Sequence, residues 1–322
     1  MKQLNLWMSA AILVLCGAAT FTSCSSNDGN SETPPSEDIE INEANFPDEN
    51  FRAIVGSRDI DKNQDGMLSA AEIAAVKTLS LDQANINNLK GVNDFTNLTV
   101  LYCAANNLGS IDISKLAKLE ELGVEANGLT QLDITKNVNL KRLWCNRNKL
   151  TQLDVSKNIY LTTISCYSNK LQQIDVTKNT QLKFFWCYKN ELTQLDVSKN
   201  AQLDTLCCDQ NKLTQLDLSK NLKLEAVFCE SNKLTSINIS PNMSKLDMFY
   251  CHSNKIGESA MGEIVANLPT AGTNLSHAHF VPICGGDANE ENVITQNQIN
   301  AAKTKGWKVM SDNGDGKTVT QL

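Results

Sequence analysis

Hydrophobic residues recur in one fixed order between Leu98 and Ile256. One copy of this order reads Leu140-Lys-Arg-Leu143-Trp-Cys145-Asn-Arg-Asn148-Lys-Leu150, followed by Leu153-Asp-Val155. The Cys position falls at 103, 145, 166, 187, 208 and 229, a period of 21 residues, with Val124 in the one gap and one extra residue before Cys251. An imperfect opening copy contains Leu79 and Leu81. Self-similarity at a fixed short period indicates a solenoid of stacked coils.

Within each copy, apolar and other residues alternate, which is typical of short extended segments. Leu143 and Cys145 flank Trp144, so this stretch is predicted to be a short strand with Trp144 pointing away from the core. Leu153 and Val155 predict a second extended segment on the opposite side of the coil. One coil would leave both faces of its core open, so neighbouring coils are expected to share a continuous apolar interior.

The pattern Leu-x-x-Leu-x-Cys-x-x-Asn-x-Leu resembles leucine-rich repeats, in particular a bacterial subclass with 21-residue repeats and Cys at the inner strand position. The resemblance covers roughly half of the chain. It implies a β-solenoid-like domain of parallel short strands with about eight to nine coils. It also implies a bacterial surface lipoprotein.

Asparagine recurs at two further places in each copy, where the coil must bend. An amide at a bend donates to and accepts from backbone groups, which a hydrocarbon cannot do, so both series are predicted to be structural. The first series is Asn106, Asn127, Asn148, Asn169, Asn190, Asn211, Asn232 and Asn254, and the second is Asn137, Asn158, Asn179, Asn200, Asn221 and Asn242.

The chain contains 11 cysteines, most of them in the repeat. Equivalent positions on neighbouring coils lie about 4.8 Å apart with parallel side chains, which is longer than the Cβ separation of a disulfide. The repeat cysteines are therefore predicted to act as small buried hydrophobes, with a thiolate metal ladder as the alternative. Cys207 falls outside the repeat position and is predicted to face outward as the most reactive thiol.

The first residues predict export and membrane anchoring. Lys2 and the apolar run from Leu6 to Phe21 form a secretory signal over residues 1–23. Phe21-Thr22-Ser23-Cys24 resembles a bacterial lipobox, which implies lipidation of Cys24 and a place in the cell envelope, on the outer membrane or cell surface. An uncleaved membrane helix is the alternative. Residues 24–43, poor in apolar side chains, are expected to be a flexible tether.

A calcium-binding loop is predicted before the repeats, within an N-terminal cap at residues 44–77. The segment 61–72 matches the twelve-residue EF-hand loop, with Gly66 at the sharp turn and Leu68 packing the loop. Its expected ligands are Asp61, Asn63, Asp65, the Met67 carbonyl, Ser69 and Glu72. Short helices are expected on both sides, and no second loop is found. Because only three ligands are charged, the expected affinity is weak, around 10⁻⁴ M, and calcium is expected to stabilise the cap.

The outward positions of the predicted sheet concentrate aromatic residues. Eight of the 18 aromatic residues lie there: Tyr102, Trp144, Tyr167, Phe184, Trp186, Tyr188, Phe228 and Tyr250. Trp144, Trp186 and Phe228 fall on every second coil, about 10 Å apart, a spacing that suits successive sugars of a glycan or the anchors of a protein. The alternative is that these rings only stabilise the sheet. Candidate polar partners are Arg142, Arg147, Lys189, Asp209, Glu230 and His252.

A column of aspartates is predicted on the second side of the coils. It contains Asp112, Asp133, Asp154, Asp175, Asp196 and Asp217, each followed three residues later by lysine. The column is interpreted as a solvated face neutralised by these lysines, with a calcium-bridged ladder as the alternative.

After the repeat region, 78–257, residues 258–322 predict an α/β cap that covers the last coil. Helices are expected at 258–267 and 296–305, and strands at 277–283 and 307–310. His277, His279 and Cys284 are only a weak indication of zinc. No nucleophile motif accompanies the three histidines.

The net charge of −7 and pI near 5.1 argue against a nucleic-acid partner. The sequence therefore predicts a non-enzymatic surface binding or adhesion protein with a protein or carbohydrate ligand. The alternatives are a structural spacer and, less favoured, a hydrolase in the C-terminal segment. Ligand identity and oligomeric state stay open.

Overall fold

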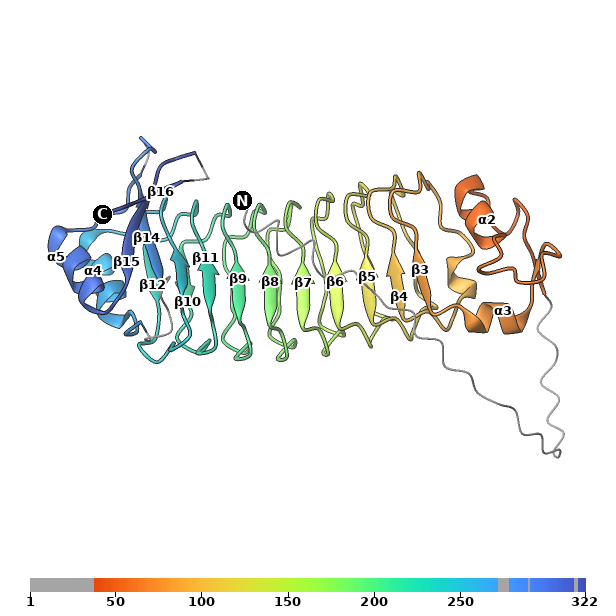
Figure 1. Ribbon diagram of the computed structural model, residues 1–322, viewed down its shortest axis with the longest axis horizontal. Coiled ribbons are helices and arrows are strands. Elements are labelled where there is room, and N and C mark those ends of the chain that lie inside the picture. Colours follow the sequence, from red (N-terminus) through yellow and green to blue (C-terminus); the bar gives the residue numbers. More distant parts are fainter. Residues whose placement is uncertain (1–37, 272–277, 289, 316–317) are drawn as a thin grey trace, which may run out of the picture.

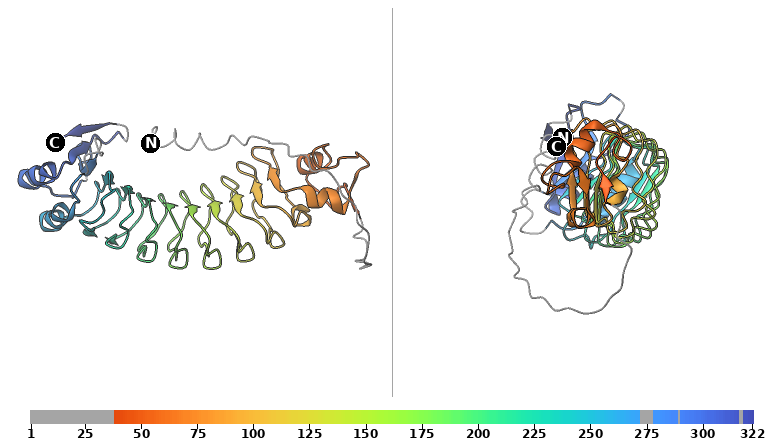
Figure 2. Two further views of the ribbon diagram at one scale, coloured as in Figure 1. Left: turned by 60° about the horizontal axis from the view of Figure 1, so that its bottom comes forward. Right: turned by 90° about the vertical axis from the view of Figure 1, so that its right-hand side faces the viewer.

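The computed structural model describes residues 38–322 apart from 272–277, 289 and 316–317. The predicted signal, the lipidation site Cys24 and most of the tether lie outside the described residues, as does His277. The coils stack into a curved solenoid with one cap at each end, and the strands line its concave side (Figures 1 and 2). Among the described residues, no helix is both long and apolar enough to span a membrane.

One twelve-stranded sheet runs through the solenoid and into the C-terminal cap. All neighbouring strands in it are parallel except the last pair. The strands are β3 (Thr78–Ser80), β4 (Val100–Tyr102), β5 (Glu121–Gly123), β6 (Arg142–Trp144), β7 (Thr163–Ser165), β8 (Phe184–Trp186), β9 (Thr205–Cys207), β11 (Ala226–Phe228), β13 (Met248–Tyr250), β14 (His279–Cys284), β15 (Lys308–Asp312) and β16 (Val319–Gln321).

The strands stack in strict register, as the period requires. Leu143 pairs with Leu122 on one side and with Ile164 on the other, and all three are fully buried. The repeat cysteines follow directly after the strands and are also buried. All nine cysteines of the described residues are free. For the repeat cysteines, the prediction of small buried hydrophobes in place of disulfides is confirmed.

The second extended segment forms a regular strand in only two coils. These are β10 (Gln215–Asp217) and β12 (Ser236–Asn238), which pair in parallel. In the other coils Leu153, Val155 and their equivalents are still buried, apart from the partly buried Ile111, but no second ladder forms. Side-chain burial therefore follows the prediction, whereas backbone pairing on that side is rarer than expected.

Both asparagine series satisfy backbone groups between coils. The Asn148 Nδ2 donates to the carbonyls of Val124 (2.9 Å) and Cys145 (3.0 Å), while its Oδ1 accepts from the amides of Asn127 and Leu129. At the second bend, the Asn158 Nδ2 donates to Ile134 (3.0 Å) and Asn137 (2.8 Å). The structural prediction is confirmed for the donors of both series except Asn242, which is exposed, and these bonds tie each coil to its neighbour. In the second series the buried Oδ1 atoms accept no hydrogen bond, as in Asn137 and Asn158.

The N-terminal cap consists of α2 (Glu49–Val55) and α3 (Ala70–Ala75), with the one-turn helix η1 (Val92–Asp94) following in the first coil. Asp48 caps α2, and its Oδ2 also accepts from the amide of Asn87 (2.7 Å), which joins the cap to the first coil. Ile39 and Glu40, expected in the tether, instead form β1 (Ile39–Glu40), which pairs antiparallel with β2 (Met67–Leu68).

The C-terminal cap continues the solenoid sheet and adds two helices, α4 (Glu258–Asn267) and α5 (Gln296–Thr304). Phe280 of β14 pairs in register with Phe249 of the last coil, and their rings stack with centroids 5.6 Å apart. Asn292 takes over the role of the repeat asparagines, since its Nδ2 donates to the carbonyls of Cys251 and Pro282 (both 2.8 Å). The cap thus closes the apolar interior with the same contacts that join the coils.

Candidate functional site

A column of alternating large and small side chains runs along the concave face. The strand register places Tyr102, Gly123, Trp144, Ser165, Trp186, Cys207, Phe228 and Tyr250 side by side in this order. Trp144, Trp186 and Phe228 are each partly exposed, and one small residue separates each from the next. The predicted spacing on every second coil is confirmed, and Tyr250 adds a ring directly beside Phe228.

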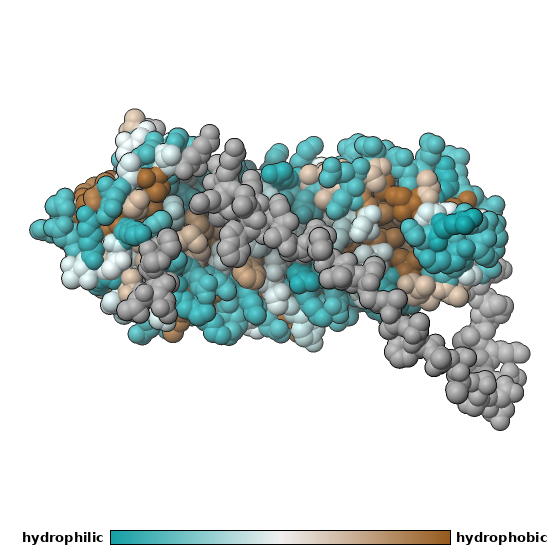
Figure 3. Space-filling view, viewed as in Figure 1, coloured by the Kyte–Doolittle hydropathy of each residue, from teal (hydrophilic) through white to brown (hydrophobic). Residues whose placement is uncertain are grey.

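The rings of this face contact one another in pairs. Their centroids lie 6.0 Å apart for Tyr102–Trp144, 4.3 Å for Tyr167–Tyr188, 5.8 Å for Phe184–Trp186 and 5.0 Å for Phe228–Tyr250. Tyr167 is buried and the others are partly exposed. Such contacts stabilise the sheet and also hold each ring in one orientation. Where Figure 3 is not overlaid by grey residues, hydrophobic residues show beside β3 and β4 and near the C-terminal cap.

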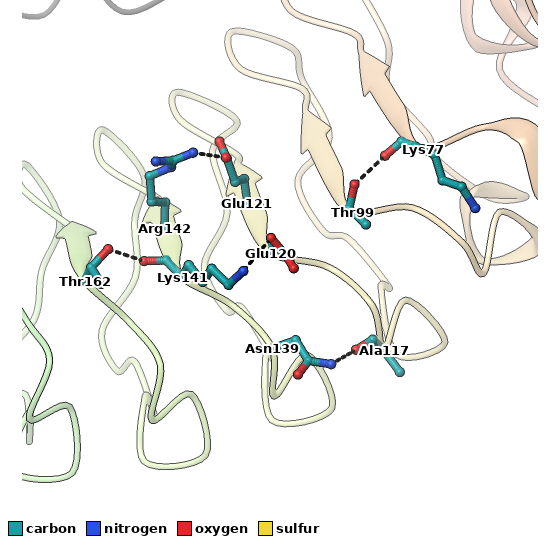
Figure 4. A network of polar contacts seen from close by, with 9 residues as sticks. All are labelled: Lys77, Thr99, Ala117, Glu120, Glu121, Asn139, Lys141, Arg142 and Thr162. Carbon is teal, nitrogen blue, oxygen red and sulfur yellow. Dashed lines mark hydrogen bonds and ion pairs between the residues drawn. The ribbon is translucent and has the colours of Figure 1, made fainter. Parts of the chain in front are cut away.

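The N-terminal half of the face pairs its charges internally. Arg142 forms an ion pair with Glu121, and the Tyr102 hydroxyl donates to the same carboxylate. Lys141 pairs with Glu120 at 2.8 Å just below (Figure 4). Burial acts to raise the pKa of Glu121, but hydrogen bonds from Arg142 and Tyr102 outweigh it and lower that pKa.

Carboxylates of the face that lack such partners behave differently. Burial raises the pKa of Glu125 to about 7 and that of Asp209 to about 6. Burial and the nearby Asp209 carboxylate raise the pKa of Glu230. His252 lies beyond them in the last coil, and burial lowers its pKa.

The prediction that Cys207 is an exposed, reactive thiol is wrong. Cys207 lies in register between Trp186 and Phe228 on the outward side of the sheet, but only 2% of it is exposed. Burial raises the pKa of its thiol well above the ordinary value. Because the thiolate is the reactive form, Cys207 is not the reactive thiol that its position in the sequence suggested.

The aspartate column is exposed, as predicted, but among the described residues its carboxylates do not form ion pairs with the lysines that follow them three positions on. Instead each carboxylate accepts from the backbone amide two residues later, as Asp154 does from Ser156 (2.8 Å). Hydrogen bonds from Ser156 lower the pKa of Asp154. The column therefore stabilises the turns of the second side.

In the predicted calcium loop, acidic side chains accept hydrogen bonds from backbone amides of the same loop. Asp61 accepts from the amides of Gln64 (2.7 Å) and Gly66 (3.2 Å), and Asp65 accepts from Met67 (2.9 Å). Gly66 has φ +79°, in the left-handed region that favours glycine. These bonds hold the Asp61 and Asp65 side chains against the backbone of the loop.

Glu72 closes the loop through protein contacts. Its Oε1 accepts from the Lys62 amide (2.7 Å) and its Oε2 from the Ser69 amide (2.9 Å) and hydroxyl (2.7 Å). The Ser69 hydrogen bonds lower the pKa of Glu72, so the carboxylate is charged at neutral pH. Among the described residues, no three His, Cys, Asp or Glu side chains are gathered tightly enough to form a metal site. The ligand types fit calcium, and an ion would compete with the Lys62 and Ser69 contacts for Glu72.

β1 pairs with the second half of the predicted loop. Leu68, the eighth loop residue, pairs with Ile39, and the Ile41 amide donates to the Gly66 carbonyl (2.9 Å). Sequence reasoning missed this strand, because a two-residue segment carries no periodicity of its own.

Parallel strands of fixed register, inward Leu and Cys, and asparagines at both bends define a leucine-rich-repeat solenoid. Among solved structures, the chain resembles the functional domain of InlJ from Listeria monocytogenes, which is described as including a cysteine ladder, with 30% identity and a TM-score of 0.60. The match covers 78% of this chain but only 58% of the InlJ chain.

A leucine-rich-repeat protein of Leptospira interrogans matches at 20% identity with a TM-score of 0.59, over 74% of this chain and 67% of that one, and this likeness shows the fold alone. No protein-family model matches the chain, and no curated protein matches it.

Proposed function

We propose that this chain is a non-enzymatic protein of the bacterial cell surface that binds a protein or glycan ligand on the concave face of its solenoid. The observation that carries the proposal is the column of partly exposed rings, Trp144, Trp186 and Phe228, held in register on one curved surface. Exposed aromatic side chains fixed on a rigid sheet lose little conformational freedom when a ligand packs against them. The export signal predicted over residues 1–23 supports a surface location. Anchoring through a lipid on Cys24 is part of the same proposal.

Binding is expected to fall at least tenfold when Trp144, Trp186 and Phe228 are all replaced by alanine, because anchors of this kind contribute more than about 1.4 kcal/mol together. The measurement is a glycan array together with a pull-down from host and bacterial surface proteins, using wild type and the triple variant. A matched control replaces Val138, Tyr160 and Leu222 by alanine; these residues are 43%, 46% and 43% exposed.

The control removes three exposed apolar side chains outside the concave sheet, so it separates loss of the face from loss of hydrophobic surface in general. Equal binding by wild type and the concave triple variant would show that the rings only stabilise the sheet and would favour a spacer. Circular dichroism of each variant confirms that the solenoid is intact.

We further propose that calcium stabilises the N-terminal cap. Asp61, Asn63, Asp65, the Met67 carbonyl, Ser69 and Glu72 would hold it, and the ion would supply a charge that fixes the loop against β1. The proposal is supported by the complete set of ligand types and by the turn at Gly66.

A chelator is expected to lower the melting temperature of wild type, and Glu72→Gln is expected to abolish that shift. Glutamine at this third helical position can still complete the capping box with Ser69, so the substitution removes a metal ligand and keeps the helix cap. Glu43→Gln, an exposed carboxylate nearby, is the control and should leave the shift intact. Identical melting of wild type with calcium and with chelator would refute the site.

A further inference from the structure

Two carboxylates, Asp209 and Glu230, lie next to each other on the concave face. Burial raises the pKa of Asp209, although the nearby Lys189 acts to lower it. Asp209 and Glu230 occupy equivalent positions in neighbouring coils. The backbone amide of Gln210 donates to the backbone carbonyl of Glu230 at 3.0 Å. None of the ion pairs among the described residues includes either carboxylate. Like charges at this spacing repel, and burial makes the repulsion stronger.

The Glu230 carboxylate points to a missing partner. Its Oε2 atom is fully buried and has no hydrogen-bond partner. Asp209 is 8% exposed, and the Gln210 side chain donates a hydrogen bond to its carboxylate at 3.1 Å. A buried acceptor without a donor costs free energy in the unliganded protein. The cost is larger for a carboxylate than for the neutral asparagine oxygens of the coils that are also unpartnered, such as Asn158 Oδ1.

The same face shows how it accommodates a cation elsewhere. At its N-terminal end Arg142 pairs with Glu121, and the Tyr102 hydroxyl joins them. Arg147 lies over the Tyr167 ring, 6.0 Å from its centroid. Arginine on this surface is therefore held by a carboxylate in one place and lies over an aromatic ring in another.

The acidic pair has the aromatic part of these arrangements and lacks the arginine. Asp209 comes two residues after Cys207, the small residue between Trp186 and Phe228 in the ring column. Glu230 comes two residues after Phe228, whose ring stacks on Tyr250 with centroids 5.0 Å apart. Rings beside two carboxylates suit a guanidinium or ammonium group, which binds through charge-assisted hydrogen bonds and cation–π contact.

We propose that Asp209 and Glu230 receive an arginine or lysine side chain from a polypeptide ligand on the concave face. The inference rests on the proposed function and narrows it from a protein or glycan to a polypeptide with an exposed basic residue. A neutral sugar would donate hydroxyls but would supply no positive charge to favour the ionised carboxylates. Since no three metal-binding side chains gather in the described part of the chain, a metal ion is a poorer fit.

The test selects peptides from a random twelve-residue library displayed on phage, with the full chain as the target. The selected peptides are expected to share an arginine or lysine, and its replacement by citrulline or norleucine should weaken binding at least tenfold. Asp209→Asn combined with Glu230→Gln should cause a loss of the same size for the unmodified peptides. The control Glu43→Gln with Glu263→Gln removes two exposed carboxylates elsewhere and should bind like wild type.

A melting curve provides a second readout. Without ligand, the Asp209→Asn and Glu230→Gln protein should melt at the same temperature as wild type or higher at pH 7.5, because it loses two carboxylates whose charged forms burial disfavours. A lower melting temperature would assign the pair a structural role and overturn the inference.

Other outcomes separate this inference from the proposed function. If the selected peptides need Trp144, Trp186 and Phe228 but bind the acidic-pair variant as well as wild type, the concave site stands and the basic-residue inference fails. Binding of glycans alone, or calcium binding that depends on Asp209 and Glu230, would also overturn the inference. If neither variant affects any ligand, the proposed function itself fails.

Discussion

Asn158→Ala is expected to lower the free energy of unfolding by about 2–4 kcal/mol, because two buried carbonyls lose their donor and a cavity replaces the amide. Asn158 is fully buried, and its Nδ2 is the atom that bonds Ile134 and Asn137. These bonds join one coil to the next, so the substitution removes contacts in the middle of a stack in which each coil relies on its neighbours. Urea denaturation followed by circular dichroism measures the change.

Asn139→Ala is the matched control. Asn139 lies at the equivalent bend of the preceding coil and donates one hydrogen bond to the Ala117 carbonyl (2.9 Å; Figure 4), but its side chain is exposed, so water replaces the lost bond. A change below about 0.5 kcal/mol is expected there. If Asn158→Ala cost no more than Asn139→Ala, the repeat asparagines would not stabilise the solenoid.

Asn158→Asp separates the donor from the shape of the side chain. A carboxylate at this position would face two carbonyl oxygens without water, so its pKa would be higher in the folded than in the unfolded protein. The folded state would then bind the proton more tightly, and the variant should gain stability as the pH falls from 7 toward 4.

Features that repeat every 21 residues could be predicted from the sequence. The inward Leu143 and Cys145 and the outward Trp144 follow from alternation, which fixes the face of every strand once one face must be buried. Both asparagine series follow from the need to satisfy backbone groups at bends. The helix 258–267 was predicted with its observed bounds because the segment ends at a proline.

Features that depend on contacts between distant segments could not be predicted. Asn292 replaces a repeat asparagine only because the cap folds back over Cys251, and no periodicity marks it. The burial of Cys207 likewise depends on its surroundings in the folded face.

Backbone conformation also escaped prediction where no glycine marks it. The residue before each asparagine of the first series has φ between 52° and 57° from the second coil onward, although Ala, Arg, Ser, Lys and Gln occupy these places. Left-handed conformation is disfavoured for such residues, so the hydrogen bonds of the following asparagine must hold it.

The candidate site shows the same division. Its ring column was predictable from the repeat, and its charges were predictable only as residues near the rings. Whether a carboxylate such as Glu121 is paired or one such as Glu230 is unpaired depends on which arginine lies on the neighbouring coil. The orphan acceptor at Glu230, which carries the proposed recognition of a basic residue, therefore emerges only from the structure.

Phe280→Ala is expected to lower the free energy of unfolding by about 3–5 kcal/mol, because Phe280 is fully buried and truncation leaves a large cavity. Its ring stacks on Phe249 of the last coil and contacts Trp307 edge to face, with centroids 6.5 Å apart. These rings form the junction between the solenoid and its cap. In a stack where each coil contacts only its neighbours, damage at this junction should loosen the end before the middle.

Hydrogen exchange tests both the size and the place of the effect. In Phe280→Ala, amides of β13, β14 and β15 should exchange faster, while those of β5 to β8 should change little. Val293→Ala is the control, because Val293 belongs to the same cap but is 45% exposed, and its amide bond to the Ile256 carbonyl is kept. Equal acceleration along the whole sheet would mean that the solenoid and cap unfold as one unit, and the cap would then do more than cover the last coil.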